Sequence, residues 1–368
     1  MYPGESPVSS PVVFASSACA LLGAFVLVSC SPVEAAPVRN NATTTTTVTS
    51  TTADTTTTTT SPIAGNPEVL PGEAWIAFQG YTAGPSGVFL VRTDGTGAHF
   101  PMADVPGFKQ QHPDWSPDGA RIVFTVTDIS TEDVWVADAD GENPVRLVDC
   151  VSPCVWADEP AWSPGGQQIA FHRMVEEADA GLSTLEILDV DAGSVEVVLT
   201  AGPTEAFYAP RWSPDGRYLV AEIAERGGES IDLEPISVAL VIIDLAGTPP
   251  TVRYLTPAGE WSVNPDWSPS SDLIVFAAPV IAGQEGQDLY TIRSDGSELA
   301  RLTTLADQGG NAAQPTFTPD GTGIIFLMQE EPDTDYMMAT VRIDGTNLGP
   351  ATSSGYRIGD HPRLRPTP

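Results

Sequence analysis

Residues 113–119 read PDWSPDG, and the apolar triplet IVF follows at 122–124. The phrase returns four times with small changes: PAWSP at 160–164, PRWSPDG at 210–216, PDWSP at 265–269 and PTFTPDG at 315–321. Its aromatic residue therefore recurs after 47, 50, 55 and 50 residues. This period predicts a repeat architecture, because one such unit cannot bury its apolar face without neighbouring units.

Each repeat contains four short strand signals. The phrase supplies the first and the apolar triplet the second. A third segment, such as 134–136, runs into an acidic Asp-Gly turn, and a short fourth segment, such as 145–148, follows. Asp-Gly between apolar segments is a strong hairpin signal, since the turn needs the positive φ that glycine adopts readily. Four antiparallel strands per repeat of about 50 residues predict one blade of a β-propeller.

The two ends of the chain share the remaining blade. The strand signals at 75–78 and 88–91 belong to a blade without its first strand, and HPRLRP at 361–366 corresponds to that missing strand. We predict an all-β fold over 73–368: a six-bladed β-propeller of four-stranded antiparallel blades, closed by the C-terminal strand completing the N-terminal blade. Closure removes the free sheet edges, so we expect a monomer.

The repeated Trp-Ser-Pro-Asp-Gly phrase, with an Asp-Gly turn two strands later, resembles the TolB-type propeller repeat. The resemblance covers roughly residues 73–368, with departures such as Phe317 in place of tryptophan. It implies the propeller fold. TolB carries an α/β domain before its propeller, and we expect no such domain here.

The N-terminal region has a different composition. An apolar run at 12–28 leads into a cysteine that resembles the end of a bacterial lipoprotein signal, so we expect a signal peptide over 1–29 and lipidation of Cys30. The expected basic residues before the run are missing, so an uncleaved anchor and ordinary secretion remain alternatives. Residues 30–72 are rich in threonine and predict a disordered stalk. Each alternative places the propeller outside the cytoplasm, in the cell envelope.

The cysteines and the net charge restrict the kinds of ligand that the chain could bind. For Cys150 and Cys154, the cysteines of the folded part, we expect a local disulfide rather than a zinc site. The net charge is -32, with 48 acidic and 16 basic residues, and Lys109 is the one lysine. This composition argues against nucleic acid, whose phosphates need Lys and Arg. The acidity could attract a cation or a basic partner, although a solvated exterior is the simpler interpretation.

No nucleophile elbow, phosphate-binding loop, zinc-protease motif or dinucleotide fingerprint occurs in the sequence, so an enzyme is the less favoured class. One candidate site remains. The residue before each repeated proline should lie near one mouth of the central channel, because the phrase forms the innermost strand. These positions are His112, Glu159, Ala209, Asn264, Gln314 and His361.

His112, His361 and Glu159 could together hold a divalent transition metal. Oligogalacturonate lyases are similar propellers, and the resemblance implies a channel metal held by His and Gln. Ordinary polar rim residues are the alternative interpretation. Trp156 and Trp261 lie outside the repeat register, in loops before inner strands, and are the expected exposed aromatics for ligand contact.

These observations favour a non-catalytic, membrane-tethered extracytoplasmic propeller that binds a protein, peptide or glycan in the cell envelope, with no cofactor required. The alternative is a metal-assisted polysaccharide lyase or hydrolase acting at the channel mouth. A structural surface protein without a dedicated ligand is a third hypothesis.

Overall fold

The computed structural model describes residues 68–70, 72–80, 86–102, 105–128, 131–177, 180–230, 233–280, 286–332, 334–352 and 360–367. The predicted signal peptide over 1–29, the lipidation of Cys30 and most of the predicted stalk over 30–72 lie outside the described residues.

Nearly all regular structure in these ranges is β-strand. Grouped by blade, the strands are β1 (Trp75–Gly80), β2 (Gly87–Arg92) and β23 (Asp360–Leu364); β3 (Lys109–Trp115), β4 (Arg121–Thr127), β5 (Glu132–Asp138) and β6 (Val145–Val148); β7 (Cys154–Trp162), β8 (Gln168–Glu177), β9 (Ala180–Asp189) and β10 (Val195–Thr200); β11 (Glu205–Trp212), β12 (Tyr218–Arg226), β13 (Pro235–Asp244) and β14 (Thr251–Tyr254); β15 (Val263–Trp267), β16 (Leu273–Pro279), β17 (Gln287–Arg293) and β18 (Ala300–Arg301); β19 (Asn311–Phe317), β20 (Gly323–Gln329), β21 (Met337–Arg342) and β22 (Gly349–Pro350). A three-residue 3-10 helix, η1 (Ala306–Gln308), lies between β18 and β19. No helix within the described ranges has the length and apolar character needed to cross a membrane.

The strands pair antiparallel within each blade, and in five blades they follow chain order from the inside outward. The first blade departs from the predicted four strands: within the described residues it has three, in the order β23, β1, β2 from the inside. A single parallel bridge between Glu132 and Trp156 joins the blades β3–β6 and β7–β10 into one eight-stranded sheet. The innermost strands β3, β7, β11, β15, β19 and β23 each contact the next, and β23 contacts β3. Six inner strands thus surround a central channel, and the predicted all-β propeller is confirmed.

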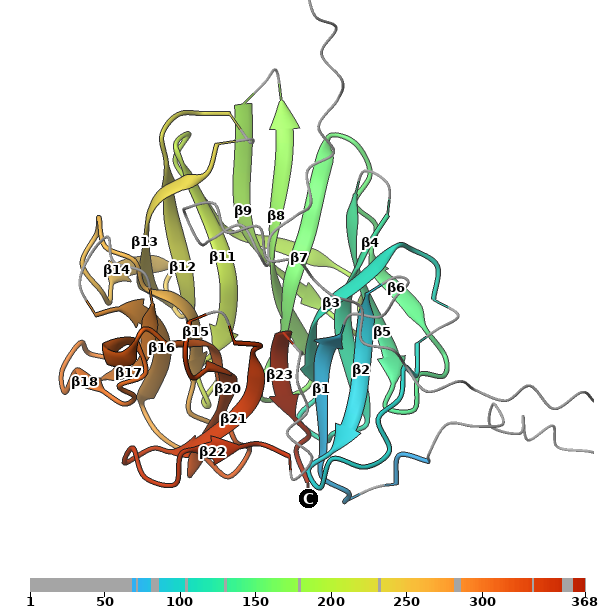
Figure 1. Ribbon diagram of the computed structural model, residues 1–368. Helices are drawn as coiled ribbons and strands as arrows, with labels where there is room; N and C mark the ends of the chain where they lie inside the picture. The colour runs from blue at the N-terminus through green and yellow to red at the C-terminus, as the bar shows by residue number, and fades with distance from the viewer. Residues whose placement is uncertain are drawn as a thin grey trace, which may run out of the picture. The chain divides into compact units, whose positions relative to one another are not determined.

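The C-terminal strand closes the ring. β23 pairs antiparallel with β1, placing Leu364 opposite Ile76 and Arg363 opposite Ala77. Figure 1 shows the dark red β23 beside the blue β1, although the two segments lie at opposite ends of the sequence. The first blade therefore takes its innermost strand from the end of the chain, as the repeat pattern predicted.

Contacts from the neighbouring blade hold this strand as well. The Trp115 indole N–H donates to the Arg363 carbonyl at 3.1 Å, and the Arg365 guanidinium donates to the Gly119 carbonyl at 2.7 Å. The Arg365 backbone N–H donates to the Trp75 carbonyl at 2.8 Å. The end of the chain is thus bonded to the first blade and to the blade that follows it.

The aromatic residues of the repeated phrase fill the space between blades. All five are buried, with exposed fractions of 4–8 %: Trp115, Trp162, Trp212, Trp267 and Phe317. Trp115, for example, packs with Ile122 and Phe124 of its own blade and with Trp75 of the preceding one. Large rings suit this position because adjacent sheets diverge, and removing one such ring from a core costs about 3–5 kcal/mol.

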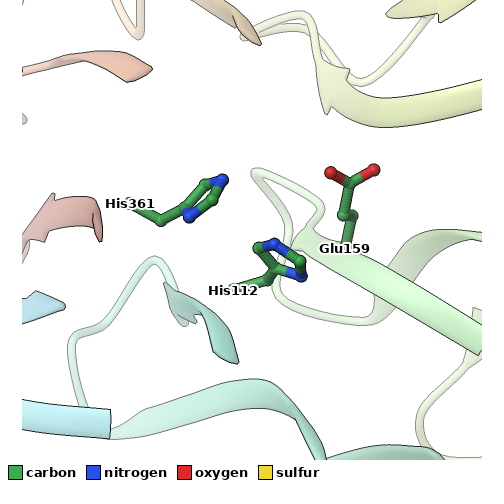
Figure 2. Close-up of side chains that lie close together, drawn as sticks. All are labelled: His112, Glu159 and His361. Carbon is green, nitrogen blue, oxygen red and sulfur yellow. The ribbon is translucent and has the colours of Figure 1, made fainter. Parts of the chain in front are cut away.

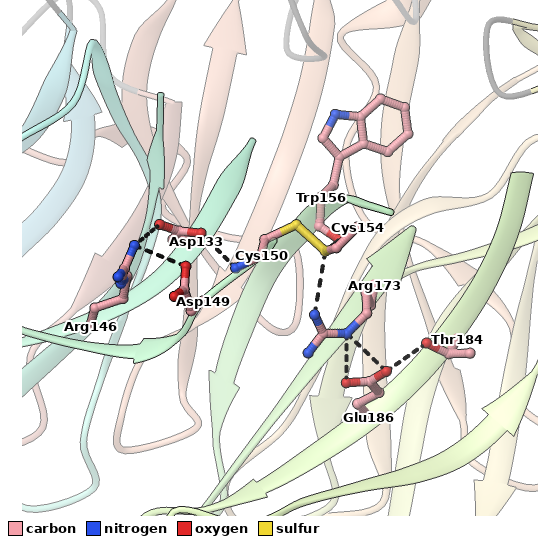
Figure 3. The surroundings of a disulfide bond; sticks show 9 residues. All are labelled: Asp133, Arg146, Asp149, Cys150, Cys154, Trp156, Arg173, Thr184 and Glu186. Atoms are coloured by element: carbon pink, nitrogen blue, oxygen red, sulfur yellow. Dashed lines mark hydrogen bonds and ion pairs between the residues drawn. A yellow bond between two sulfur atoms is a disulfide. The ribbon is translucent and has the colours of Figure 1, made fainter. Parts of the chain in front are cut away.

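A disulfide joins Cys150, after β6, to Cys154, the first residue of β7. It lies where the chain crosses from one blade to the next (Figure 3). The Cys150 backbone N–H donates to Asp133 at 2.8 Å, and Arg173, which pairs with Glu186 at 3.0 Å, lies 3.3 Å from the Cys154 sulfur. The crosslink therefore fixes the start of the inner strand β7.

Gly119 provides a test of ring closure. Its φ is +65°, and a Cβ there would lie 2.5 Å from the Pro366 carbonyl oxygen. Gly193 has the same φ of +65°, but nothing lies within 4 Å of its Cβ position. We predict that Gly193→Ala destabilises by roughly 1 kcal/mol through backbone strain alone. Gly119→Ala should cost a further 1–3 kcal/mol or so, because it displaces the C-terminal segment.

Urea unfolding of both variants measures this difference. Equal destabilisation by the two substitutions would show that the C-terminal segment does not pack on Gly119.

Candidate functional site

Six equivalent residues face the channel in an unusual backbone conformation. Each has a φ between 46° and 54°, in the left-handed region that residues other than glycine seldom adopt. We call this set the channel ring: His112, Glu159, Ala209, Asn264, Gln314 and His361. They are the residues before the repeated prolines, so the sequence period predicted their equivalence.

The local reason is a β-bulge. In every inner strand the pairing register shifts across the ring residue and its proline, for example between Gln111 and Asp114 in β3. A residue before proline avoids the right-handed helical region, and a bulge redirects a side chain that would otherwise follow the pleat. Left-handed conformations of this kind cost about 1–3 kcal/mol each and persist where the surroundings hold them.

Neighbouring blades supply that support. The backbone N–H of Ala209 donates to Glu159 Oε2 at 2.6 Å, and that of His361 donates to Gln314 Oε1 at 2.7 Å. The backbone N–H of Asn264 donates in the same way to Glu222 Oε1 at 2.6 Å. Each of these bonds satisfies a backbone donor that the bulge removed from the sheet, and each joins one blade to the next.

His112 is fixed by a buried carboxylate. Its Nδ1 lies 2.7 Å from Asp158 Oδ1, which also accepts from the Thr125 hydroxyl at 2.5 Å and from the Glu159 backbone N–H at 2.6 Å. Burial alone would raise the pKa of Asp158, but the charge and hydrogen bond of His112 hold it well below its ordinary value. The same pairing raises the pKa of His112 despite its burial.

His361, on the C-terminal strand β23, packs against His112. The two rings meet edge to face, with centroids 4.4 Å apart. Burial and the nearby charge of His112 lower the pKa of His361 well below its usual value. His361 Nδ1 is buried and has no hydrogen-bond partner among the described residues.

Glu159 completes this group. One ligand-type atom from each of His112, Glu159 and His361 lies within 4.8 Å of the others. Figure 2 shows the two rings side by side, with the Glu159 carboxylate nearby. Of the ring residues, these three offer the nitrogen and carboxylate atoms that bind transition metals.

A second layer of charge lies two residues further along the inner strands. Arg363 Nε is 3.7 Å from Asp114 Oδ1, and Arg211 Nε is 3.9 Å from Asp266 Oδ1. Burial raises the pKa of both aspartates, while the two arginines oppose the shift. Asp114 also accepts the Trp162 backbone N–H at 2.8 Å, so this layer again connects adjacent blades.

A small cavity lies between the two layers. Its lining comprises Glu159, Ala209, Arg211, Asn264, Pro265, Gln314, Pro315, Thr316, His361 and Arg363. The cavity volume is about 10 Å³, which is near the minimum needed to hold one water molecule. Four of the predicted ligand-binding residues therefore line one cavity. His112 does not line it but packs against His361, which does.

The two predicted aromatics lie elsewhere. Trp156 and Trp261 are both half-buried and neither lines this cavity. Trp156 lies beside the disulfide in β7, and Trp261 packs against the hydrophobic cluster around Val275 and Ala277.

Sequence reasoning missed several charged or titratable residues of the channel, among them Asp158, His172, Arg211, Glu222 and Arg363. Arg211 and Arg363 follow the repeated proline directly, so the period could have shown them. Asp158 directly precedes a ring residue, and His172 and Glu222 share one position on the second strand, opposite Asp158 and Tyr208. Aligning the repeats along the second strand would have revealed this pair.

Comparison with known proteins agrees with the fold. A family model of the TolB beta propeller domain matches residues 127–366. The chain therefore belongs to the TolB β-propeller domain family, and the resemblance seen in the repeats is confirmed.

Individual relatives are distant. An uncharacterized protein of Agrobacterium fabrum is 31% identical over 109 residues, which is 28% of this chain and 36% of that protein. The structure is similar to TolB from Acinetobacter baumannii (TM-score 0.57, 17% identity, 82% of this chain and 68% of that chain). It is also similar to a chain of Kuenenia stuttgartiensis hydrazine synthase (TM-score 0.61, 12% identity, 81% of this chain and 48% of that chain). The chain spans about a third of the length of the curated relatives it matches.

At these identities the structural matches establish the fold alone. One fold accommodates many functions, so the function has to be argued from the channel residues.

Glu222 makes the stability of the channel sensitive to pH. Burial and the charge of Glu159 raise its pKa to about 8, from 4.5 in an unfolded chain. The folded protein therefore binds more protons than the unfolded one between about pH 4.5 and 8, and this group's contribution to stability is lost as the pH rises through that window. Glu222→Gln, which keeps an acceptor for Asn264, should remove that loss.

We predict that the difference in unfolding free energy between Glu222→Gln and the wild type grows in favour of the variant by more than about 1 kcal/mol from pH 5.5 to pH 8.5. Urea unfolding at the two pH values measures this change. Glu225→Gln, an exposed residue on the same strand, is the matched control for the loss of one charge. A gain independent of pH, or equal in both variants, would contradict the assignment.

Proposed function

We propose that the chain is a non-catalytic binding protein of the cell envelope, and that its propeller contacts a protein, peptide or glycan at the mouth of the channel. The observation that carries the proposal is the channel ring: six strained residues direct their side chains to one place. Strained backbone at a shared position is a feature that binding sites often retain. The half-buried Glu159, Asn264 and Gln314 are the ring residues most accessible to a partner.

The size of the cavity favours surface contact. Sites for small organic ligands usually measure about 300–1,000 Å³, far more than the cavity here. A partner would therefore rest on the rim of the channel, as an extended surface does. This argument favours a protein or peptide over a sugar held inside the ring.

The predicted N-terminal signal supports an extracytoplasmic location. A lipid on Cys30 and a threonine-rich stalk would hold the propeller outside the membrane, where the partner would be found. A disulfide between Cys150 and Cys154 also suits an oxidising compartment.

Binding at the channel mouth can be tested by affinity capture from envelope extracts with the detergent-solubilised full chain. Asn264→Ala removes a polar rim group at a position where Ala209 shows that alanine is tolerated. We expect it to lower recovery of the partner at least fivefold, as the loss of one good contact does. Val252→Ser, on the exposed outer strand β14, should recover as much partner as the wild type. Equal recovery by all three proteins would place the binding surface elsewhere.

The proposed anchor is tested separately. Cys30→Ala should move the chain from the membrane fraction to the soluble fraction and abolish incorporation of labelled fatty acid. Retention of Cys30→Ala in the membrane fraction would contradict lipid anchoring and favour an uncleaved anchor.

A metal-assisted polysaccharide lyase or hydrolase is the second candidate function, and the grouping of His112, Glu159 and His361 is what favours it. An enzyme of this kind would release reducing or unsaturated sugar ends from acidic polysaccharides. If the chain is such an enzyme, His112→Ala abolishes the release of sugar ends. If it is a binding protein, neither the wild type nor the variant releases sugar ends.

A further inference from the structure

We propose that His112, Glu159 and His361 bind one divalent first-row transition metal ion, and that Asp158 is the positioning residue for His112. The site would cross-link the C-terminal strand to two blades. The inference goes beyond the binding function proposed above and does not depend on it.

The three side chains are close enough to share an ion. Their ligand atoms lie within 4.8 Å of one another. Tetrahedral coordination at metal–ligand distances of about 2.0–2.2 Å places ligand atoms about 3.3–3.6 Å apart. The side chains therefore each need to move by less than about 1 Å to coordinate one ion.

His112 already has the arrangement of a metal ligand. Histidine ligands commonly donate their second ring nitrogen to a carboxylate, which fixes the ring and strengthens it as a donor. His112 Nδ1 lies 2.7 Å from Asp158 Oδ1, which leaves Nε2 to face an ion. Asp158 is itself held by Thr125 and by the Glu159 backbone.

The other two ligands are also prepared. Within the part of the chain that the structure describes, His361 Nδ1 is buried without a hydrogen-bond partner, a costly state that an ion would relieve. Glu159 uses Oε2 to accept the Ala209 backbone N–H, and this bond orients the carboxylate while leaving Oε1 for coordination. All three residues have left-handed backbone, so the bulges themselves direct these side chains into the channel.

The ligand set selects the class of ion. Two imidazoles and one carboxylate suit zinc, iron, cobalt or nickel, whereas calcium and magnesium require mainly oxygen ligands. Because the three residues lie on β3, β7 and β23, binding of the ion would tie the closing strand to the next two blades of the ring.

The test uses the full chain, freed of metal by a chelator and titrated with Zn²⁺ by calorimetry and with Co²⁺ by visible absorption. We expect one equivalent per chain, ligand-field bands from Co²⁺ with imidazole nitrogen bound, and a rise of several degrees in Tm. His361→Ala and His112→Ala should each weaken binding at least 100-fold. Asp158→Asn, which keeps every ligand, should weaken it 10–100-fold.

His99→Asn is the matched control, because His99 is a buried histidine of the first blade outside the proposed site and its Nδ1 lies near the Gly97 carbonyl. It should bind as the wild type does. Titration with Ca²⁺ measures the weak attraction of cations to a chain of net charge -32. We expect Ca²⁺ not to displace Co²⁺ from the site.

Failure of the wild type to bind a stoichiometric ion would overturn the proposal, and so would binding that His112→Ala and His361→Ala leave intact. If those variants do not fold, the wild-type stoichiometry and Co²⁺ spectrum decide, because a spectrum without nitrogen ligands excludes this site. Unchanged affinity in Asp158→Asn would refute the positioning role of Asp158. None of these outcomes depends on finding a protein partner, so this proposal and the binding function fail separately.

Discussion

The antiparallel pairing of β23 with β1 is the contact on which the rest of the structure depends. It joins segments almost 290 residues apart, and the entropy cost of closing such a loop grows only slowly with its length. In return every inner strand lies between two others, and the apolar faces of the blades pack against neighbouring blades. The arrangement of the channel follows directly, because one of its six sides is the C-terminal strand.

The channel residues to which both proposals assign a role also stabilise the fold. Glu159, Glu222 and Gln314 accept backbone N–H groups from the next blade, so they hold the bulges that shape the ring. Their removal would leave buried donors without partners, which costs about 1–3 kcal/mol for each donor. Experiments on the site must therefore separate loss of fold from loss of binding, and residues such as Asn264, whose side chain supports no neighbouring blade in the described contacts, are the most informative.

Much of the fold could be predicted because the repeat carries redundant information. The period of Trp115 and its equivalents predicted the blades, and HPRLRP at the C-terminus predicted how the ring closes. The equivalence of the channel ring followed from the same period. The left-handed backbone did not, since a residue before proline is normally expected to be extended.

The chemistry of the site was less predictable. His112, Glu159 and His361 could be grouped from their register, but the Asp158 contact depends on side-chain packing across two blades. His172 and Glu222 lie on second strands, whose repeat signal is a simple apolar triplet with no polar marker. The two tryptophans chosen for exposure, Trp156 and Trp261, are half-buried, because local hydrophobic contacts outside the repeat period decide their environment.

Amide hydrogen exchange along β23 shows directly whether the C-terminal strand closes the ring. If it does, the amides of Arg363 and Leu364 exchange as slowly as those of Ile76 and Ala77, their partners in β1. Exchange at 360–364 as fast as in an unstructured peptide, while β1 stays protected, would contradict the closure and the channel site built on it.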